Sequence, residues 1–498
     1  MASKEYTHDT FINGAWLQGA GAEFTSTDPT SGETLWTGNE ATADQVGAAV
    51  DAAEAAFDAW TLTPIEDRMV IIGRYAELLT EKRPELAELI AKEAGKALWD
   101  ATGEATAMAN KIAISLKAFE ERTGTRESEN GAIRSRLTHR AHGVMAVFGP
   151  YNFPGHLPNG HIVPALIAGN TVVFKPSEIT PAVADFMVKV WEEAGLPAGV
   201  LNMVQGGRDT GAALVKAEGI NGLLFTGSAQ TGLAISRQLQ DRPQVIQALE
   251  MGGNNPLIVH EAEDTTAAAV LTILSAFVSS GQRCTCARRL IVPVGAAGDA
   301  FIDALLAAME KITVGRWSDD EQPFMGPVVS ARAADMVLKA QQNLIASGAK
   351  ALRAVERLDL GDAFLSPGLL DVTGMDNKPD EEVFGPMLQL IRVADFEAAI
   401  KEANNTKYGL ASGLISDSRE LFESFYPRAR AGIVNWNQQL TGAASTAPFG
   451  GIGWSGNHGP SAYYAADYCS FAVATMEQSE GKVAVAAMPV GLKLDGGT

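Results

Sequence analysis

Apolar residues early in the chain recur at the spacing of amphipathic helices. One such face is formed by Val46, Val50, Ala53, Phe57 and Trp60. Thr42 and Gln45 precede this face with the spacing of a capping box, which predicts that a helix begins there. Thr63, which is followed by proline, predicts the cap of a second helix that ends near residue 82. Further helices are predicted from residue 84 and over residues 101–121.

From residue 143 the helical spacing gives way to short β-like runs that alternate with helical segments. The predicted strands cover residues 143–148, 171–174, 200–204, 222–225, 245–249, 256–259 and 289–292. Helices are predicted between several of them, including residues 181–194 and 229–240. This alternation predicts a parallel sheet covered by helices. A second α/β series follows, from about residue 264 to residue 440.

Composition narrows the class of protein. The chain has 498 residues, which is enough for about three domains. Its formal net charge of −20 argues against nucleic acid as a partner, because phosphate binding needs a basic surface. No apolar run approaches the ~18 residues that span a membrane, and the first residues lack the apolar core of a signal peptide. We therefore expect a cytoplasmic protein that binds neither membrane nor nucleic acid.

Cysteine and histidine usage bears on metals and redox state. Three cysteines do not make a disulfide framework, and they fit a reducing compartment. The chain has no HExxH or CxxC motif, so no metal site is expected.

Residues 281–289, Gly-Gln-Arg-Cys-Thr-Cys-Ala-Arg-Arg, place a thiol among three arginines. They follow an apolar segment that is either helical or extended, and they precede a predicted buried strand. Positive charge beside Cys284 would favour its thiolate, which is the form a nucleophile needs. The alternative is that Cys284 is a small buried apolar side chain, the commonest fate of a free cysteine.

Polar residues follow two of the predicted strands. Asn152 lies between two prolines, where its amide can donate to a developing oxyanion, although the same sequence is typical of a turn. Lys175 and Glu178 stand at the carboxyl end of a strand, where open α/β sheets bind ligands. Each can reach a ribose hydroxyl there, or the pair can form a solvated turn.

Glycine-rich connections supply three more candidates. Gly227, Ser228 and Gly232 lie where a strand leads into a helix, which can direct backbone amides towards a pyrophosphate. The spacing is neither GxGxxG nor a P-loop, so the signal is weak. Glu250 ends an apolar strand before paired glycines, an environment that can raise its pKa towards that of a general base, unless it caps a helix or forms a salt bridge.

A last motif joins the acid Glu382 to the aromatic ring of Phe384. Such a pair can contact the nicotinamide end of a dinucleotide. A surface turn is the alternative.

Taken together and in order, these motifs resemble the aldehyde dehydrogenase superfamily. The runs that carry the resemblance are Pro-Tyr-Asn-Phe-Pro at 150–154, Lys-Pro-Ser-Glu at 175–178, Phe-Thr-Gly-Ser at 225–228, Glu-Met-Gly-Gly at 250–253, Gly-Gln-Arg-Cys at 281–284, Glu-Val-Phe-Gly-Pro at 382–386 and Pro-Phe-Gly-Gly at 448–451. The resemblance covers about residues 10 to 475. It implies an α/β fold with a Rossmann-type NAD domain, an α/β catalytic domain and a small β oligomerisation element.

The resemblance also implies roles for the candidate residues. Cys284 would be the nucleophile, Asn152 would help to form the oxyanion hole, and Glu250 would activate water to release the acyl group. The cofactor would be NAD. Its contacts would come from Lys175, Glu178, Gly227, Ser228, Gly232, Glu382 and Phe384. A carboxylate at position 178 would bond a free ribose 2′-hydroxyl and repel a 2′-phosphate, which favours NAD over NADP.

Domain boundaries and assembly follow from the same resemblance. We expect residues 1–121 and 143–255 to form the NAD-binding domain and residues 256–445 to form the catalytic domain. Residues 122–142 and 446–498 would supply the oligomerisation element and the C-terminal segment. The family usually forms homodimers or homotetramers, and the sequence does not separate the two.

The substrate implied by the resemblance is a small anionic aldehyde. A protein of charge −20 repels such a molecule at long range, so local cations must bind its carboxylates. The charged or titratable candidates are Arg283, Arg122, Lys111, His156, His161 and His458, with Asn437 and Ser445 as neutral alternatives. Two interpretations compete with this one. The substrate is another acidic semialdehyde, or the chain is a catalytically silent structural member of the fold.

Cys286 stands two residues after the candidate nucleophile. In an extended chain the two thiols would face the same side, and a disulfide between them would then be conceivable. A packed thiol is the expected alternative, because bridges between such close residues are strained.

Overall fold

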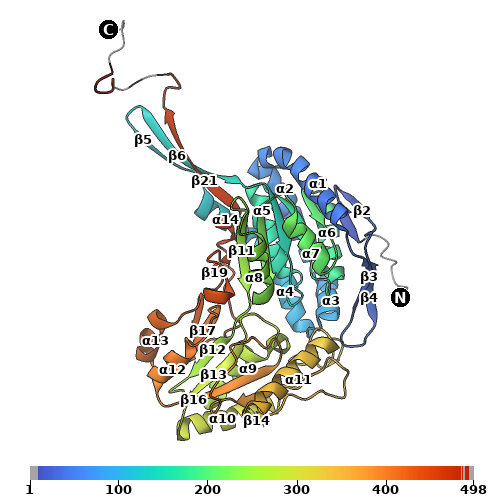
Figure 1. Cartoon of the computed structure of the whole chain (residues 1–498), viewed down its shortest axis with the longest axis vertical. Coiled ribbons are helices and arrows are strands. Elements are labelled where there is room, and N and C mark those ends of the chain that lie inside the picture. The colour runs from blue at the N-terminus through green and yellow to red at the C-terminus, as the bar shows by residue number, and fades with distance from the viewer. Residues whose placement is uncertain (1–8, 484, 486–487, 493–498) are drawn as a thin grey trace.

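The computed structural model of the chain describes residues 9–483, 485 and 488–492. The expected domain segments 1–121 and 446–498 therefore extend in part outside the described residues. Two α/β lobes lie against each other, and a narrow β arm projects from them (Figure 1). Each unit is built around its own β-sheet.

The first lobe contains a seven-stranded sheet with the strand order β11-β10-β7-β8-β9-β1-β2. The five strands from β11 to β9 are parallel, whereas β1 and β2 form an antiparallel hairpin at one edge. The strand bounds are β1 Thr10–Ile12, β2 Ala15–Leu17, β7 Val144–Phe148, β8 Thr171–Lys175, β9 Leu201–Met203, β10 Ile220–Gly227 and β11 Ile246–Met251. The strands predicted from residue 143 onward are confirmed.

Helices cover both faces of this sheet. Their bounds are α1 Ala43–Leu62, α2 Ile65–Glu81, α3 Arg83–Ala94, α4 Leu98–Thr123, α5 His156–Ala168, α6 Pro181–Glu193, α7 Arg208–Lys216 and α8 Ala229–Gln238. Successive residues of a strand point to opposite faces, so Met145 and Val147 of β7 enter one apolar core while Ala146 and Phe148 enter the other. The sheet is thus buried on both sides, as its apolar strands require.

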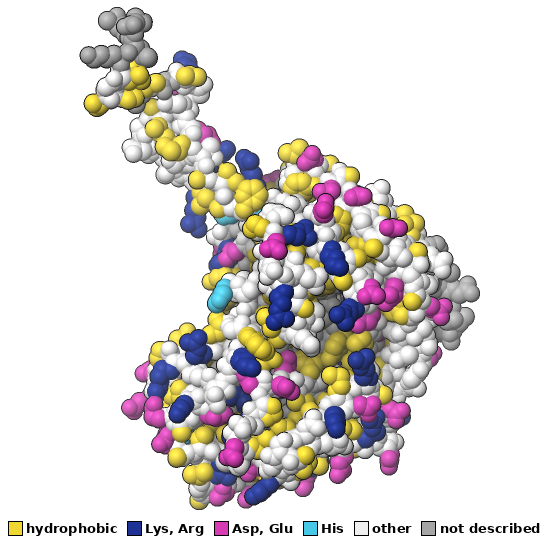
Figure 2. All heavy atoms as spheres, in the orientation of Figure 1, with side chains coloured by type: hydrophobic (Ala, Val, Ile, Leu, Met, Phe, Trp, Pro, Cys, Tyr) yellow, Lys and Arg dark blue, Asp and Glu magenta, His cyan; other side chains and the backbone are white. Residues whose placement is uncertain are grey.

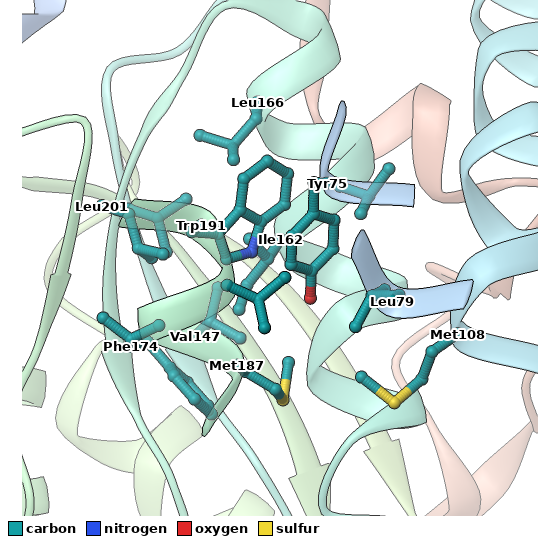
Figure 3. Close-up of a cluster of buried hydrophobic side chains, with 14 of the residues drawn as sticks. Tyr75, Leu79, Met108, Val147, Ile162, Leu166, Phe174, Met187, Trp191 and Leu201 are labelled. Atoms are coloured by element: carbon teal, nitrogen blue, oxygen red, sulfur yellow. The ribbon is translucent and has the colours of Figure 1, made fainter. Parts of the chain in front are cut away.

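The larger core is fixed by a pair of stacked aromatic rings (Figure 3). Tyr75 of α2 stacks on Trp191 of α6, with ring centroids 3.6 Å apart and planes 7° from parallel. The Tyr75 hydroxyl donates to the Oδ1 atom of Asn159 on α5, at 3.2 Å. Burial of each large ring contributes about 1.5–3 kcal/mol, and the contact joins three helices on this face of the sheet.

The helix starts confirm one predicted cap and correct another. Thr42 and Gln45 form the expected capping box at the start of α1. Thr63 was expected to cap α2, but that prediction is wrong. Its hydroxyl donates instead to the Ala59 carbonyl of the preceding helix, and Pro64 takes the cap position without a side-chain bond.

The second lobe has a sheet with the order β14-β15-β16-β13-β12-β17-β18, parallel except for the edge strand β14. The strand bounds are β12 Asn255–Val259, β13 Ala287–Pro293, β14 Lys350–Arg353, β15 Gly368–Asp371, β16 Met387–Val393, β17 Ala411–Ile415 and β18 Ile433–Trp436. The helices of this lobe are α9 Thr265–Ala276, α10 Ala296–Met309, α11 Ala331–Ala346, α12 Phe396–Ala403 and α13 Arg419–Phe425. The apolar segment before Cys284 is therefore helical.

The projecting arm is a three-stranded antiparallel sheet with the order β21-β6-β5. Its strands are β5 Arg126–Asn130, β6 Ile133–Ala141 and β21 Ser470–Gln478. Smaller elements are the pair β3 Glu23–Thr27 and β4 Thr34–Asn39, the pair β19 Pro448–Phe449 and β20 Ser461–Ala462, and the short helix α14 Ala465–Tyr468. The first sheet takes strands from segments 1–121 and 143–255, the arm takes strands from 122–142 and 446–498, and β12 of the second sheet begins at Asn255. The expected domain boundaries stay predictions.

Candidate active site

Cys284 lies just after a backbone turn that few residues can adopt. The short 3₁₀ segment η1 Val278–Gly281 contains Ser279 and Ser280 at φ of 54° and 57°, followed by Gly281 at φ of 72°. Left-handed conformations of non-glycine residues cost about 1–3 kcal/mol each and persist only where surrounding contacts hold them. The turn therefore places Cys284 at a fixed point between the two lobes.

Helix α4 supplies the contacts that hold this turn. Asp100 accepts from the Ser279 hydroxyl at 2.5 Å and from the Nη2 atom of Arg283 at 2.7 Å. Both Asp100 and Ser279 are buried. The Ser280 hydroxyl donates to the Gly326 carbonyl at 2.6 Å. The hydrogen bonds offset the strain of the left-handed residues, and those of Asp100 link the first lobe to the cysteine turn.

The arginines around Cys284 hold the loop together. Arg283 is bonded to Asp100, and Arg288 donates to the carbonyl oxygens of Gly281 at 2.6 Å and Arg283 at 3.0 Å. Arg289 donates to the carbonyl oxygens of Asn254, Glu402 and Ala403. The structure thus shows that these arginines pack and hold the loop.

The electrostatic surroundings of Cys284 differ from the expectation of a stabilised thiolate. Burial, followed by the negative charges of Glu382 and Glu250, raises the pKa of the Cys284 thiol to about 12, against the opposing effect of Arg288. The expectation failed because burial disfavours the thiolate more than the nearby positive charge favours it. As a nucleophile, Cys284 would first have to give up its proton.

Asn152 lies beside the cysteine loop. It follows β7 and is 7% exposed, and its Nδ2 atom donates to the Gln282 carbonyl at 2.9 Å. Gln282 is two residues before Cys284, so this hydrogen bond joins the end of β7 in the first sheet to the loop that carries the thiol. An amide N–H group held in this position can serve as an oxyanion donor.

Glu250 is buried near the end of β11, with 4% exposure. Its Oε1 atom accepts from the Ser461 backbone N–H at 3.2 Å, whereas its Oε2 atom is buried and has no hydrogen-bond partner. Burial raises the pKa of the Glu250 carboxyl well above its usual value, as the sequence led us to expect. A carboxyl with a raised pKa is a stronger base near neutral pH, and the free oxygen is available for a proton.

Glu382 and Phe384 lie on the other side of the cysteine loop. Glu382 pairs with Arg288 at 3.5 Å, and a Cβ atom on Gly252 would lie 1.7 Å from its Oε2 atom. Phe384 stacks against the Arg288 guanidinium at 5.2 Å. The alternative of a surface turn is thus wrong for Glu382, whose side chain is 13% exposed.

The proposed cofactor contacts lie at the carboxyl ends of neighbouring strands. Lys175 ends β8, and its Nζ atom donates to the Pro176 carbonyl at 2.8 Å and lies 3.5 Å from Glu178. Two strands away, β10 ends at Gly227 and the exposed Ser228 caps α8. This edge thus offers a carboxylate, an amine and a helix N-terminus, a donor set that fits the ribose and phosphates of a dinucleotide.

Gly232 has a packing role in this edge. A Cβ atom there would lie 2.4 Å from the sulfur of Met251, the last residue of β11. The absence of a side chain lets α8 approach the sheet, which keeps its N-terminus near the strand ends.

Half of the residues considered for binding a substrate carboxylate are engaged elsewhere, Arg283 among them. Arg122 forms two hydrogen bonds with Asp467, and the ring nitrogens of His161 contact Tyr468 at 2.8 Å and Thr226 at 3.1 Å. The Asn437 amide is bonded to the backbone of Ser416. His458 is exposed and Ser445 is half-buried. The remaining candidates, Lys111 and His156, each have a buried nitrogen without a hydrogen-bond partner.

Cys286 is fully buried, whereas Cys284 is partly exposed. Residues 283–286 form a turn, closed by a 3.0 Å bond from the Cys286 N–H group to the Arg283 carbonyl. The argument that both thiols face the same side required an extended chain and therefore does not apply. Both cysteines are free thiols.

The comparison with known families now identifies the chain. The model of the family described as "Aldehyde dehydrogenase family" matches residues 16–472 of this chain. The chain belongs to the aldehyde dehydrogenase family. A relative from Serratia proteamaculans, named N-succinylglutamate 5-semialdehyde dehydrogenase, is 55% identical over 97% of this chain and 99% of its own length.

Solved aldehyde dehydrogenases and related enzymes share the fold. Betaine aldehyde dehydrogenase from Staphylococcus aureus, solved with NAD+, has a TM-score of 0.89 at 26% identity, with 96% of each chain covered. An E. coli structure described as an NADP dependent enzyme has a TM-score of 0.88 at 30% identity and covers 96% of this chain and 99% of its own. The family fold and a nicotinamide cofactor are thus established for this dehydrogenase.

Two residues that position the candidate site, Asn255 and Ser461, were not predicted from the sequence. The Nδ2 atom of Asn255 donates to the carbonyls of Cys284 and Cys286, and the Ser461 N–H group holds Glu250. The paired asparagines at 254 and 255, directly before a strand, are the one pattern that could have suggested the first contact. The second joins positions 211 residues apart, which no local pattern predicts.

In the part of the chain that the structure describes, no three His, Cys, Asp or Glu side chains are grouped as metal ligands. No helix there has the length and apolar character needed to cross a membrane.

The turn before Cys284 yields a testable prediction. A Cβ atom on Gly281 would lie 2.2 Å from the Gly385 carbonyl oxygen, so Gly281→Ala must displace backbone on one side or the other. We expect Gly281→Ala to lower kcat by at least about tenfold and to destabilise the protein by more than ~2 kcal/mol. Dehydrogenase rates and thermal unfolding measure the two effects.

Gly295→Ala is the matched control, because Gly295 also has a positive φ, of 105°, but has open space around it. It should carry the conformational cost of about 1 kcal/mol and leave kcat unchanged. Equal loss of activity in the two variants would contradict the role assigned to the Gly281 contact.

Proposed function

We propose that this dehydrogenase oxidises N-succinylglutamate 5-semialdehyde to N-succinylglutamate with NAD+, a step in arginine degradation by the succinyltransferase route. The likeness to the Serratia relative over nearly the whole of both chains is the observation that carries the substrate. The site supports the reaction type, because a thiol, an amide donor and a buried carboxyl with a raised pKa surround one loop.

In the first half of the reaction, the Cys284 sulfur bonds to the aldehyde carbon and the thiol loses its proton. That proton passes to solvent water, which leaves the Glu250 carboxylate free to act as the base in the second half of the reaction. The aldehyde oxygen becomes an oxyanion, which the amide of Asn152 and the backbone N–H group of Cys284 stabilise. Losing one such donor typically lowers the rate by about 10²–10³.

In the second half, Cys284 holds the oxidised acyl group as a thioester. A bound nicotinamide supplies the hydride acceptor for this oxidation. Glu250 then removes a proton from water, and the resulting hydroxide attacks the thioester carbon and releases the acid. The departing sulfur takes up the proton that Glu250 accepted, which regenerates the thiol and the carboxylate. An available base at position 250 favours hydrolysis over transfer of the acyl group to coenzyme A.

For the cofactor, we propose NAD with contacts from Lys175, Glu178, Gly227, Ser228 and Gly232 at its adenosine and pyrophosphate end, and from Glu382 and Phe384 at its nicotinamide end. The Glu178 carboxylate is 52% exposed, so it is free to bond a ribose hydroxyl. A 2′-phosphate would meet its negative charge, which favours NAD over NADP.

We further propose that the protein is a cytoplasmic homodimer or homotetramer assembled through its arm. Strands β5 and β21 are the edges of the arm sheet, and β21 exposes Phe471 and Met476. Apolar side chains lie along the arm in Figure 2. Open strand edges with exposed apolar side chains are suited to pairing with another subunit. The free thiol of Cys284 requires a reducing compartment.

Substrate preference tests the proposal. The wild-type enzyme should show kcat/KM at least about 100-fold higher for the succinylated semialdehyde than for succinate semialdehyde or for glutamate semialdehyde, since only the first carries a carboxylate on an acyl arm. NADH formation at 340 nm measures all three. Equal values would contradict the substrate assignment and leave another small acidic semialdehyde as the substrate.

A further inference from the structure

One face of α4 carries three buried charges, of which two are matched. Asp100 pairs with Arg283 at 2.7 Å, and Glu104 pairs with Lys96 at 2.6 Å. Lys111 lies further along the same face, is 2% exposed and has no hydrogen-bond partner for its Nζ atom. A buried ammonium without a counter-charge is expensive, so its retention calls for an anion that binds there.

Other unpartnered polar atoms lie near Lys111. The Ser115 hydroxyl, one turn further along α4, is buried without a partner, and so is the Nδ1 atom of His156 at the start of α5. The charge of Lys111 lowers the pKa of His156, after burial, which shows that the two side chains are close. Gly160 faces Lys111 across the helix interface, with the Lys111 Cε atom 3.9 Å from its Cβ position. The missing side chain at 160 lets the Lys111 side chain lie against the backbone of α5.

The N-terminus of α5 does not itself account for this arrangement. The Glu104 carboxylate already accepts from the N–H groups of Gly155 and His156, at 2.9 and 3.0 Å. The free donors are therefore side chains. One of them, His156, follows Asn152 by four residues in the chain.

We propose that Lys111 determines substrate specificity by binding the succinyl carboxylate of the substrate, with His156 as a second donor. The identity of the ligand rests on the proposed function. The position of its carboxylate rests on the unpaired charge of Lys111. The succinyl carboxylate lies eight bonds from the aldehyde carbon, a reach of about 10 Å when extended. Side chains on a helix lean towards its N-terminus, so Lys111 leans back towards Asp100, the residue that holds the Cys284 turn.

The positive charge of Lys111 explains why we assign a carboxylate to this site. Burial lowers the pKa of Lys111 to about 8, which leaves the amine largely protonated near neutral pH, and an arriving carboxylate would favour the charged form. The phenol of Tyr468 and the thiol of Cys469 lie nearby, and burial raises the pKa of both, so both are neutral. The protein itself thus supplies Lys111 with no negative charge in its described surroundings.

The test compares Lys111→Met with the wild-type enzyme on two aldehydes. One is the succinylated semialdehyde, and the other is its analogue with the succinyl carboxylate replaced by an uncharged amide. Lys111→Met should raise KM for the acid by about 10- to 100-fold, the loss expected for one charged hydrogen bond, and should leave kcat and the amide nearly unchanged. Lys111→Arg, which retains the charge, should keep most of the preference for the acid.

Lys117→Met is the matched control, because Lys117 lies on the same helix with its side chain 64% exposed. It should leave both substrates unaffected. Thermal unfolding without substrate gives a second readout. Removal of an unpaired buried charge should leave the melting temperature equal or higher in Lys111→Met, whereas a structural lysine would lower it.

The outcomes separate this inference from the proposed function. If wild type shows no preference for the succinylated semialdehyde over succinate semialdehyde, the proposed function fails. The acid and amide forms of whichever semialdehyde wild type prefers then test Lys111 in the same way. An unchanged acid-to-amide ratio in Lys111→Met, or a lower melting temperature with equal loss on both substrates, would overturn the role of Lys111.

Discussion

Replacing Cys284 with alanine is expected to lower kcat by at least about 10⁴-fold, because no other thiol can form the bond to the aldehyde carbon. Cys286 and Cys469 are both fully buried, whereas Cys284 is partly exposed. The variant should fold normally, since the Cys284 side chain makes no hydrogen bond that the loop depends on. NADH formation at enzyme concentrations high enough to detect a 10⁴-fold loss measures the effect.

Cys286→Ala is the control for this experiment. The Cys286 sulfur makes only a long contact, 3.9 Å, with the Val278 carbonyl, so its loss should change kcat by no more than a few-fold. Substantial turnover by Cys284→Ala, or equal losses in the two variants, would remove Cys284 as the nucleophile.

Replacing Glu250 with glutamine should stop the reaction after one acyl transfer. Glutamine keeps the shape and the acceptor for the Ser461 N–H group but cannot take a proton from water. Mixing with substrate and NAD+ should give at most about one NADH per site in a burst, followed by turnover at least about 100-fold below wild type. Rapid-mixing absorbance at 340 nm measures both phases. Glu263→Gln, at an exposed position, should behave as wild type.

The same variant has a second expected effect, of opposite sign. The negative charge of Glu250 raises the pKa of Cys284, so its removal should lower that pKa and speed alkylation of the thiol at a given pH. A variant that alkylates faster but turns over more slowly separates loss of the base from general damage. In wild type, kcat should fall as the pH drops through the raised pKa of Glu250, because the protonated carboxyl cannot act as a base. A pH-independent kcat across that range would contradict its role.

The sequence was sufficient to predict the fold where local patterns decide structure. The apolar runs from residue 143 onward became strands because such residues are buried on both faces of a parallel sheet. Thr63 failed as the cap of α2 because it ends α1 instead, where its hydroxyl donates to the Ala59 carbonyl, and α2 begins only after Pro64. Local spacing suggested both the strands and the cap. The contacts that neighbouring residues make then decided whether each of them formed.

The site was harder to predict because its contacts join distant parts of the chain. Arg289 looked like a cation beside a thiol, yet it bonds the Glu402 carbonyl, 113 residues away. Arg283 is occupied by Asp100, 183 residues before it. The motifs identified the chemical groups, but only the tertiary structure shows that the arginines hold the loop and that Lys111 has no partner.

The central claim is that Cys284 carries the acyl group that Glu250 helps to release. Its most direct test is mass spectrometry of Glu250→Gln quenched after one turnover with the succinylated semialdehyde and NAD+. The account predicts one acyl group per subunit, mapped to the peptide that contains Cys284, with no such adduct accumulating in wild type. An NADH burst without an adduct, or an adduct on any other residue, would contradict it.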